Sequence, residues 1–387
     1  MHATKLRLAT FDAVNHIKAW YRCLIVACLG HLGVPTSDAQ VQSTDSKHGW
    51  APVEWSGYGG YAFPHRQELE ALVTGHAWGG TAAWGREVTG GWVTQGKRNR
   101  AWQGIQLGCV YAGSPDLGYV VSGLWMIRIP LLHNTYTEWG TGLGWASTPF
   151  DIEDAPRSFA LGSHFNAGLH AAIGHQWNWG KNGRVMVAAE FTHFSNGSIA
   201  LPNLGINLIG LRCTFQPNRE TWDEGPLLLP EIPTVFQRSG WQIETALRMG
   251  LRDVELPMGP RHPVSNLHAS LHYRTKEASS WSGTCAFDLT YNQSLRVHGF
   301  PEPAINPIDR IQTAVLAGGR WHFGKTALTI LQGWILSHPD RELGRRHLLV
   351  TIQAPICPEI RLEVGLRSFS LRADYPFIGV AWAPGAH

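Results

Sequence analysis

Repeated runs of alternating apolar and polar residues constrain this sequence more than any other feature. From about residue 50 onward, runs of roughly 9 to 14 residues are separated by Gly, Pro and Asn. Successive side chains of a strand point to opposite faces, so each run would present one apolar and one polar face. A strand that crosses a membrane needs ~9–11 residues, whereas a soluble strand usually has ~5–6. Runs of this length therefore favour membrane-spanning strands.

About sixteen such strands are predicted by pattern alone. The runs fall at roughly 53–63, 78–88, 101–113, 118–130, 136–146, 160–176, 183–195, 204–216, 240–253, 264–275, 280–292, 308–322, 325–337, 345–355, 358–371 and 374–382. A sheet in lipid must close on itself, because an open edge leaves backbone groups without partners. We therefore predict an all-β protein, a transmembrane antiparallel β-barrel of the bacterial outer membrane. A large secreted barrel or sandwich is the alternative.

The acid- and Pro-rich stretch 216–234 divides the strands into two sets. Two barrels in tandem would need a linker crossing between them, and this stretch is the only candidate for such a linker. A single barrel of about 14–16 strands is therefore favoured over an 8-stranded barrel followed by a second β module. The predicted domains are a first half at 40–216, a Pro-rich connection at 217–239 and a C-terminal half at 240–387.

The N-terminus has the pattern of a cleavable signal peptide, predicted at 1–39. Four basic residues precede the apolar run 24–30, and Ser37-Asp38-Ala39 offers small residues where a signal peptidase cuts. An uncleaved membrane anchor is the alternative, but the run is well short of the ~20 apolar residues that a spanning helix needs. Export to the outer membrane is therefore expected.

Composition excludes several other classes of function. Only 16% of the residues are charged, against about 25% in a typical soluble domain. A net charge of +3 is too small to predict nucleic-acid binding, and no basic run is interleaved with aromatic residues. The cysteines beyond residue 39 are far apart and show no metal-ligand spacing. We expect neither a metal nor another cofactor, and the residues indicate no oligomeric state.

One hairpin carries the pattern of a hydrolase site. In the run 183–195, His193 and Ser195 share a face with Val187 and Phe191. After a turn rich in Gly, Pro and Asn, the chain resumes at Asn207. If the two runs pair as antiparallel strands, His193 can lie opposite Asn207 with Ser195 diagonal to both. This arrangement is typical of a serine, a histidine base and an orienting residue.

Whether a residue has an odd or an even position along its strand, here called its parity, predicts the face of the sheet on which its side chain lies. His193, Ser195 and Asn207 have the parity of the apolar, lipid-facing residues, whereas Glu190, Arg184 and Arg212 have the parity of the lumen, where ion pairs are expected. Polar groups on the lipid side are expensive unless they serve a purpose. The seventh strand of an even barrel with periplasmic termini runs outward. The predicted substrate is therefore a lipid of the outer leaflet.

The stretch HFSNGSIALPNLGIN, from His193 to Asn207, resembles the signature of the lipid A 3-O-deacylase family of outer-membrane barrels. LGSHFN, at 161–166, is similar to the preceding strand of that family. The resemblance implies an esterase that removes the 3-O-linked hydroxyacyl chain of lipid A, with Ser195 as nucleophile and His193 as base. Asn207 stands where the best-known family pattern has glutamate. A neutral amide can orient the imidazole but cannot stabilise the imidazolium as a carboxylate does.

Further residues are assigned supporting roles. Asn196 and Gly197 are candidate donors to the oxyanion. His164 and Asn166 share a parity on the preceding strand and are candidate substrate contacts, with hydrogen bonding to a loop as the equal alternative. His65 and Arg66 are candidate ligands of the lipid A phosphates, with a solvated loop as the alternative. Two other functions stay open, a non-catalytic barrel that acts as a channel or structural protein and a phospholipid esterase on the same scaffold.

Overall fold

The computed structural model describes residues 53–88, 101–132, 134–180, 183–217, 240–254, 257, 259–275, 281–295, 306–323, 326–340, 343–369 and 372–384. The predicted signal peptide, 1–39, and residues 218–239 of the predicted connection lie outside these ranges. Within them, the helical segments are α2 (Gln67–Glu70) and η3 (Pro307–Arg310). Neither is long and apolar enough to cross a membrane.

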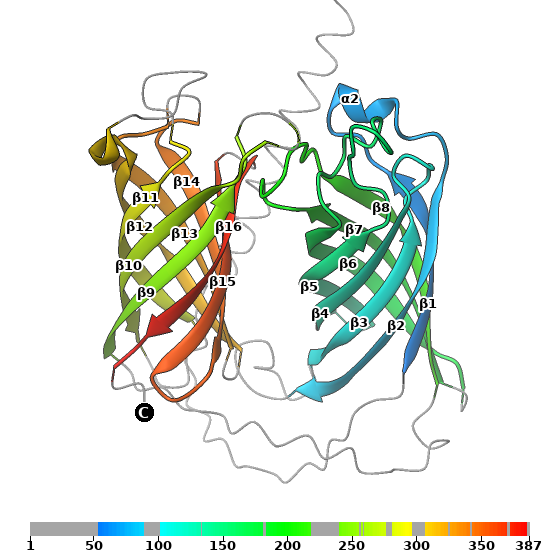
Figure 1. Cartoon of the computed structure of the whole chain (residues 1–387). Helices are drawn as coiled ribbons and strands as arrows, with labels where there is room; N and C mark the ends of the chain where they lie inside the picture. The colour runs from blue at the N-terminus through cyan, green and yellow to red at the C-terminus, as the bar shows by residue number, and fades with distance from the viewer. Residues whose placement is uncertain are drawn as a thin grey trace, which may run out of the picture. The chain divides into compact units, whose positions relative to one another are not determined.

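Eight strands form the first closed barrel, which Figure 1 shows in blue to green. They are β1 (Glu54–Ala62), β2 (Ala77–Val88), β3 (Ala101–Tyr111), β4 (Tyr119–Leu132), β5 (Thr135–Ala146), β6 (Phe165–Asn178), β7 (Gly183–Ser195) and β8 (Ile206–Pro217). Each strand pairs antiparallel with the next, and β8 pairs with β1 in the register Trp55 to Phe215. The β1–β8 ladder leaves no open edge, as a sheet in lipid requires.

Eight further strands form a second closed barrel. They are β9 (Gly240–Arg252), β10 (His262–Arg274), β11 (Trp281–Asn292), β12 (Ile311–Phe323), β13 (Thr326–Ser337), β14 (Arg346–Pro355), β15 (Ile360–Phe369) and β16 (Arg372–Trp382). β16 pairs with β9, with Phe377 opposite Gly250, and closes this sheet as well. The second barrel is complete without any strand of the first.

The predicted all-β antiparallel barrel is confirmed, but the preference for a single barrel of 14–16 strands is wrong. The prediction assumed that two barrels need a linker crossing between them. An even number of antiparallel strands returns the chain to the end of the barrel at which it entered. Two eight-stranded barrels can therefore follow one another without a connection that runs from one end of a barrel to the other.

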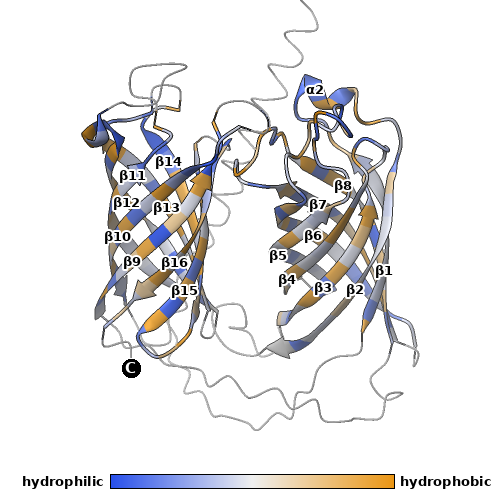
Figure 2. Ribbon diagram, viewed as in Figure 1, coloured by the Kyte–Doolittle hydropathy of each residue, from blue (hydrophilic) through white to orange (hydrophobic). Residues whose placement is uncertain are grey.

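The two faces of the strands differ as a membrane barrel requires. Along β7 and β8, Val187, Phe191, Ile209 and Leu211 are exposed on the outside, whereas the residues between them are mostly buried. In the second barrel, Leu247 is exposed on the outside in the same way. Figure 2 shows hydrophobic residues distributed along the strands of both barrels. A band of outward apolar side chains is typical of strands that face lipid.

The lumen of the first barrel is filled by charged side chains that pair with one another. Arg128 donates to Glu54 at 2.8 and 2.9 Å and to Glu138 at 2.8 Å. Arg212 contacts both Glu138 and Glu190, the second at 2.8 Å. Arg184 instead donates to the side chain of Gln176 at 3.3 Å. Buried charges are tolerated when they are paired and hydrogen-bonded, so this network fixes strands from several sides of the barrel.

The second barrel is filled in the same manner by a different set of residues. Arg248 pairs with Glu363 at 2.8 Å, and Arg320 pairs with Glu244 at 3.0 Å. Asp374 accepts from Arg367 at 2.6 Å. These buried ion pairs occupy the space that a wider barrel would leave as a water-filled channel.

Apolar loop residues close one end of the first barrel, which we call the loop end. The loops 63–76, 112–118, 147–164 and 196–205 all lie at this end, with α2 among them in Figure 1. Their apolar side chains join the strand ends in one buried cluster that contains Leu72, Leu117, Leu161, Phe194 and Ile206. Such packing restricts loop motion, because each side chain would lose buried contacts on moving. The last residues of β7 and the first of β8 are therefore held in a rigid setting.

Closure of the first barrel can be tested with one engineered cysteine. Gly57 lies opposite Cys213 across the β1–β8 seam, and both face outward. Opposed Cα atoms of an antiparallel pair are about 4.5–5.5 Å apart, within the range of a disulfide. Gly57→Cys should give a disulfide with Cys213 on mild oxidation, detected by mapping the linked peptide.

Gly59→Cys is the matched control, because its partner is Leu211 and the space around both glycines is open. A single large barrel would leave β1 and β8 unpaired. Failure of Gly57→Cys to cross-link, or equal cross-linking of Gly59→Cys, would contradict the observed seam.

Candidate active site

The β7–β8 ladder brings His193 and Asn207 together. The two residues are opposed in the antiparallel register, next to the pair formed by Phe194 and Ile206. His193 Nδ1 lies 2.6 Å from Asn207 Oδ1. Because the amide oxygen can only accept, His193 Nδ1 is the donor and Nε2 of the neutral ring is left as an acceptor. An imidazole in this tautomer can take a proton from a neighbouring hydroxyl group.

Ser195 follows His193 by two residues on the same outward face of β7. It is partly exposed, as is His193, and its cross-strand partner on β6 is Ala167. Residues two apart along a strand lie about 6.6 Å apart at their Cα atoms, so their side chains are neighbours. No hydrogen bond joins Ser195 to His193 among the described residues. Hydrogen bonds of this kind are often long in the absence of substrate.

The chain that follows β1 covers Asn207 from outside. Phe63 N donates to the carbonyl oxygen of Asn207 at 2.7 Å, which extends the β1–β8 pairing by one step. Two residues later, His65 Nδ1 lies 2.6 Å from Asn207 Nδ2. This cover leaves Asn207 only 8% exposed although it has the parity of the outward residues. His65, a candidate phosphate ligand in the sequence analysis, lies against the Asn207 amide.

The pKa of His65 lies below its usual value. Partial burial of the imidazole is the largest cause, and the positive charge of Arg66 and the nearby His193 act in the same direction. A hydrogen bond with the backbone of Leu204 opposes them. His65 is therefore held neutral over a wider pH range than a free histidine.

The turn after β7 engages most of the donors of Asn196. Its backbone N–H donates to Asn203 Oδ1 at 3.1 Å, and its side-chain Nδ2 donates to the carbonyl oxygen of Ala200 at 2.8 Å. Its Oδ1 accepts from Ser198 N at 3.0 Å. Asn196 therefore shapes the turn, whereas no hydrogen bond of the described residues occupies the N–H of Gly197. Gly197 adopts a positive φ of 67°, which few other residues tolerate.

His164 and Asn166 are not brought to this group of side chains. Asn166 has inward parity and donates to the carbonyl oxygens of Ser163 and His164, whereas Ser195 lies opposite Ala167. His164 is bonded through Nδ1 to the carbonyl oxygen of Ala146 at 2.7 Å. Its ring is stacked on an adjacent tryptophan. Both residues thus organise the loop before β6.

Arg66 is exposed, and its backbone leads into α2. No salt bridge or side-chain hydrogen bond engages its guanidinium among the described residues. The group therefore stays available for an anion near His65. No cluster of three or more His, Cys, Asp or Glu suited to a metal occurs in the described part of the chain.

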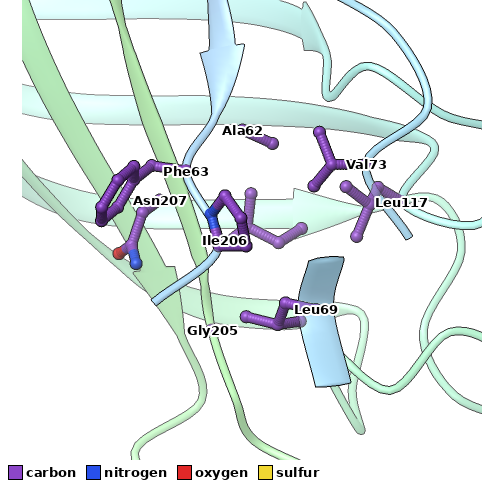
Figure 3. Close-up of a pocket in the computed structure, with 9 residues that line it drawn as sticks. Ala62, Phe63, Leu69, Val73, Leu117, Gly205, Ile206 and Asn207 are labelled. Atoms are coloured by element: carbon purple, nitrogen blue, oxygen red, sulfur yellow. The ribbon is translucent and has the colours of Figure 1, made fainter. Parts of the chain in front are cut away.

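A small crevice, mostly apolar and open to solvent, adjoins Asn207 at the loop end. In Figure 3, Leu69, Val73 and Leu117 lie on one side of it, and Phe63 and Asn207 lie together on the other. Ile206 and Gly205 complete its floor. On the side of Asn207 that faces the loops, the neighbouring side chains are therefore mostly apolar.

Gly205 positions the His193 ring and was not singled out in the sequence. Its φ is +82°, and a Cβ atom there would lie 2.7 Å from His193 Cε1. A glycine between an Asn-Leu turn and the first strand residue is the signal that could have identified it. Nothing in the sequence of the segment 63–65 indicates its contact with Asn207, because that contact depends on closure of the barrel.

Gly205→Ala should therefore destabilise the protein and displace His193. A residue with Cβ at positive φ costs about 1–2 kcal/mol, and contact with the ring adds to this. Gly180→Ala is the matched control, since Gly180 also has positive φ but open space around it. Urea titration in detergent and the histidine Cε1–H resonances measure the two effects. Equal stability of the variants and an unmoved His193 resonance would contradict the close approach.

Comparisons with known proteins show which part of the chain resembles a known family. The model of the lipid A 3-O-deacylase (PagL) family matches residues 67–216. No curated protein matches the chain. Two solved mutants of the Rhodopseudomonas blastica porin are 9% and 10% identical to it, and each comparison covers 87% of this chain and 99% of the porin. Their TM-score is 0.17, so the fold rests on the strand pairing described above.

The family match ends within β8 and spans the strands that hold His193, Ser195 and Asn207. The second barrel, from β9 onward, lies outside the matched residues. The resemblance of the sequence to the lipid A 3-O-deacylase family is thereby confirmed over residues 67–216, from α2 to β8, whereas β1 precedes the matched residues.

Proposed function

We propose that the first barrel is an outer-membrane serine esterase that hydrolyses the 3-O-linked hydroxyacyl chain of lipid A. The observation that carries the proposal is the 2.6 Å hydrogen bond from His193 to Asn207, on the outward face beside Ser195. This bond leaves Nε2 of His193 as a proton acceptor on the side of the sheet where lipid would lie. The family match over the same residues supports the substrate class.

The proposed reaction begins with attack of Ser195 Oγ on the ester carbonyl while His193 Nε2 takes the serine proton. His193 then gives that proton to the leaving sugar oxygen, so that the C–O bond breaks and an acyl-enzyme remains. Water, activated by His193, attacks the acyl group and releases a hydroxy fatty acid. The Asn207 amide keeps the imidazole in the required tautomer but adds no negative charge.

The N–H of Gly197 is the better candidate donor to the developing oxyanion. The backbone N–H of Asn196 and one N–H of its side-chain amide are already used within the turn. A donor without a partner in the free enzyme can bind the oxyanion without first breaking another hydrogen bond. Asn196 supports the site by fixing the turn that presents Gly197.

Barrel geometry favours an outer-leaflet substrate. At the site end the loops 63–76, 147–164 and 196–205 are long, whereas at the other end the connections after β4 and β6 are short and that after β2, 89–100, is longer. Long loops are extracellular in bacterial outer-membrane barrels. An acyl chain in the outer leaflet could then lie against the exposed Phe191 and Ile209, with a lipid A phosphate beside Arg66. This orientation requires export, for which residues 1–39 are the proposed signal peptide.

A non-catalytic barrel is the second candidate, and one observation favours it. The site contains a neutral amide where a carboxylate would stabilise the imidazolium, and Ser195 has no hydrogen bond to His193 in the free protein. Such a protein would keep the fold of the family without its chemistry. The packed lumen gives a channel role no support.

Ser195→Ala should abolish release of the hydroxyacyl chain from purified lipopolysaccharide while the barrel stays folded, because no other nucleophile replaces the hydroxyl. Mass spectrometry of lipid A measures the loss of one hydroxyacyl group. Ser163→Ala, at a half-buried serine of a neighbouring loop whose hydroxyl donates to the carbonyl oxygen of Phe165, is the control with unchanged activity. Unmodified lipid A with the wild-type protein would favour the non-catalytic barrel, and lysophospholipid would indicate a phospholipid esterase.

Asn207→Asp should raise kcat by at least about tenfold. The substitution keeps the atoms in place and adds the negative charge that stabilises the imidazolium, the reverse of an Asp→Asn change that costs about 10⁴ in a serine protease. Initial rates of hydroxyacyl release near neutral pH measure the effect. A rate equal to or below that of the natural protein would show that the amide does not limit the reaction.

A further inference from the structure

His65 and His193 lie on opposite sides of one amide. Asn207 Oδ1 is 2.6 Å from His193 Nδ1, and Asn207 Nδ2 is 2.6 Å from His65 Nδ1. The three side chains come from different parts of the barrel, β7, β8 and the segment after β1. The amide of Asn207 is therefore a bridge between two imidazoles.

The ends of an amide differ, since the oxygen only accepts and the nitrogen only donates. In the observed orientation, His193 carries its hydrogen on Nδ1 and keeps Nε2 as an acceptor. His65 must then accept at Nδ1, so its hydrogen is on Nε2. Neutral His65 and neutral His193 therefore hold opposite tautomers.

A half-turn of the amide reverses this order. Its nitrogen would then donate to His193 Nδ1, the hydrogen of that ring would move to Nε2, and Nε2 could no longer accept a proton from Ser195. The reversed amide presents its oxygen to His65, which must donate from Nδ1. A protonated His65 donates from Nδ1 and so favours the reversed orientation.

We propose that His65 is a positioning residue, which keeps the Asn207 amide in the orientation that makes His193 a base and releases it on taking up a proton. This inference rests on the proposed esterase function and adds a pH-sensitive element to it. An amide at position 207 needs such a partner, whereas a carboxylate accepts hydrogen bonds with either oxygen and has no wrong orientation.

The surroundings of His65 fit this role. Arg66 from the same loop and His193 from β7 face it as cationic or titratable groups, and Leu204 contributes its backbone. His65 is itself exposed, but its partial desolvation and these two neighbours lower its pKa, so the ring is neutral and accepts from Asn207 near neutral pH. As the pH falls through that lowered pKa, His65 becomes a donor and the active orientation is lost.

Two substitutions separate orientation from packing. In His65→Ala nothing accepts from Asn207 Nδ2, and hydroxyacyl release at neutral pH should fall about tenfold, the scale of one lost hydrogen bond. In His65→Gln an amide oxygen can accept without titrating, so most of that activity should be retained. His76→Gln, an exposed histidine of the same loop, is the matched control with unchanged activity.

The pH profile is the readout that a merely structural role would not change. Between about pH 5 and 8, the acid side of the natural profile should reflect two protons, one on His193 and one on His65. The His65→Gln profile should reflect one. A natural activity that depends on Ser195, together with identical profiles for the natural protein and His65→Gln, would overturn the inference and leave the proposed function intact.

Nitrogen-15 NMR of histidine-labelled protein in detergent tests the same point without substrate. The natural protein should show His193 protonated at Nδ1 and His65 at Nε2. His65→Ala should give a mixture of His193 tautomers, while His76→Gln should not. If His193 keeps one tautomer in His65→Ala, the inference fails whatever the hydrolase assay shows. If the tautomers mix but Ser195→Ala leaves hydrolysis unchanged, the proposed function fails and the positioning role stands.

Discussion

Hydrogen bonding between β1 and β8 is the interaction on which the first barrel and its candidate site depend. It closes the sheet, so that no strand edge meets lipid. It also carries the chain from Ala62 through Phe63 along Asn207, which brings His65 to the amide. Without this seam, His193 and Asn207 would still face each other within one hairpin, but the third side chain would be absent.

The interior and the loop end serve different purposes around that seam. Ion pairs such as Arg128 with Glu54 fill the lumen and fix the strands, while apolar residues such as Leu117 and Phe194 pack the loop end. The charges of these ion pairs therefore lie in the lumen, away from the outward surface that holds Ser195. The lumen of the second barrel is also filled by ion pairs, which come from its own residues. This barrel therefore closes without any strand of the first.

Alternation was sufficient to predict the strands and the pairing of His193 with Asn207, because both follow from a period of two and from pairing within one local hairpin. Strand number per barrel was not predictable in this way, since the closing pairs, Trp55 with Phe215 and Phe377 with Gly250, lie far apart in the sequence. The contact of His65 with Asn207 is equally non-local. For Asn166, parity left substrate contact and hydrogen bonding to a loop both open, and the structure shows its side chain donating to the loop carbonyl oxygens of Ser163 and His164.

The position of these side chains at the seam has a consequence for biogenesis. A folding chain can form the hairpin of β7 and β8 early, because its contacts are local. His65 reaches the Asn207 amide only when the first and last strands of the barrel have met. Maturation of the candidate site is therefore linked to closure of the barrel, and an unfinished barrel would leave the Asn207 amide without its second imidazole.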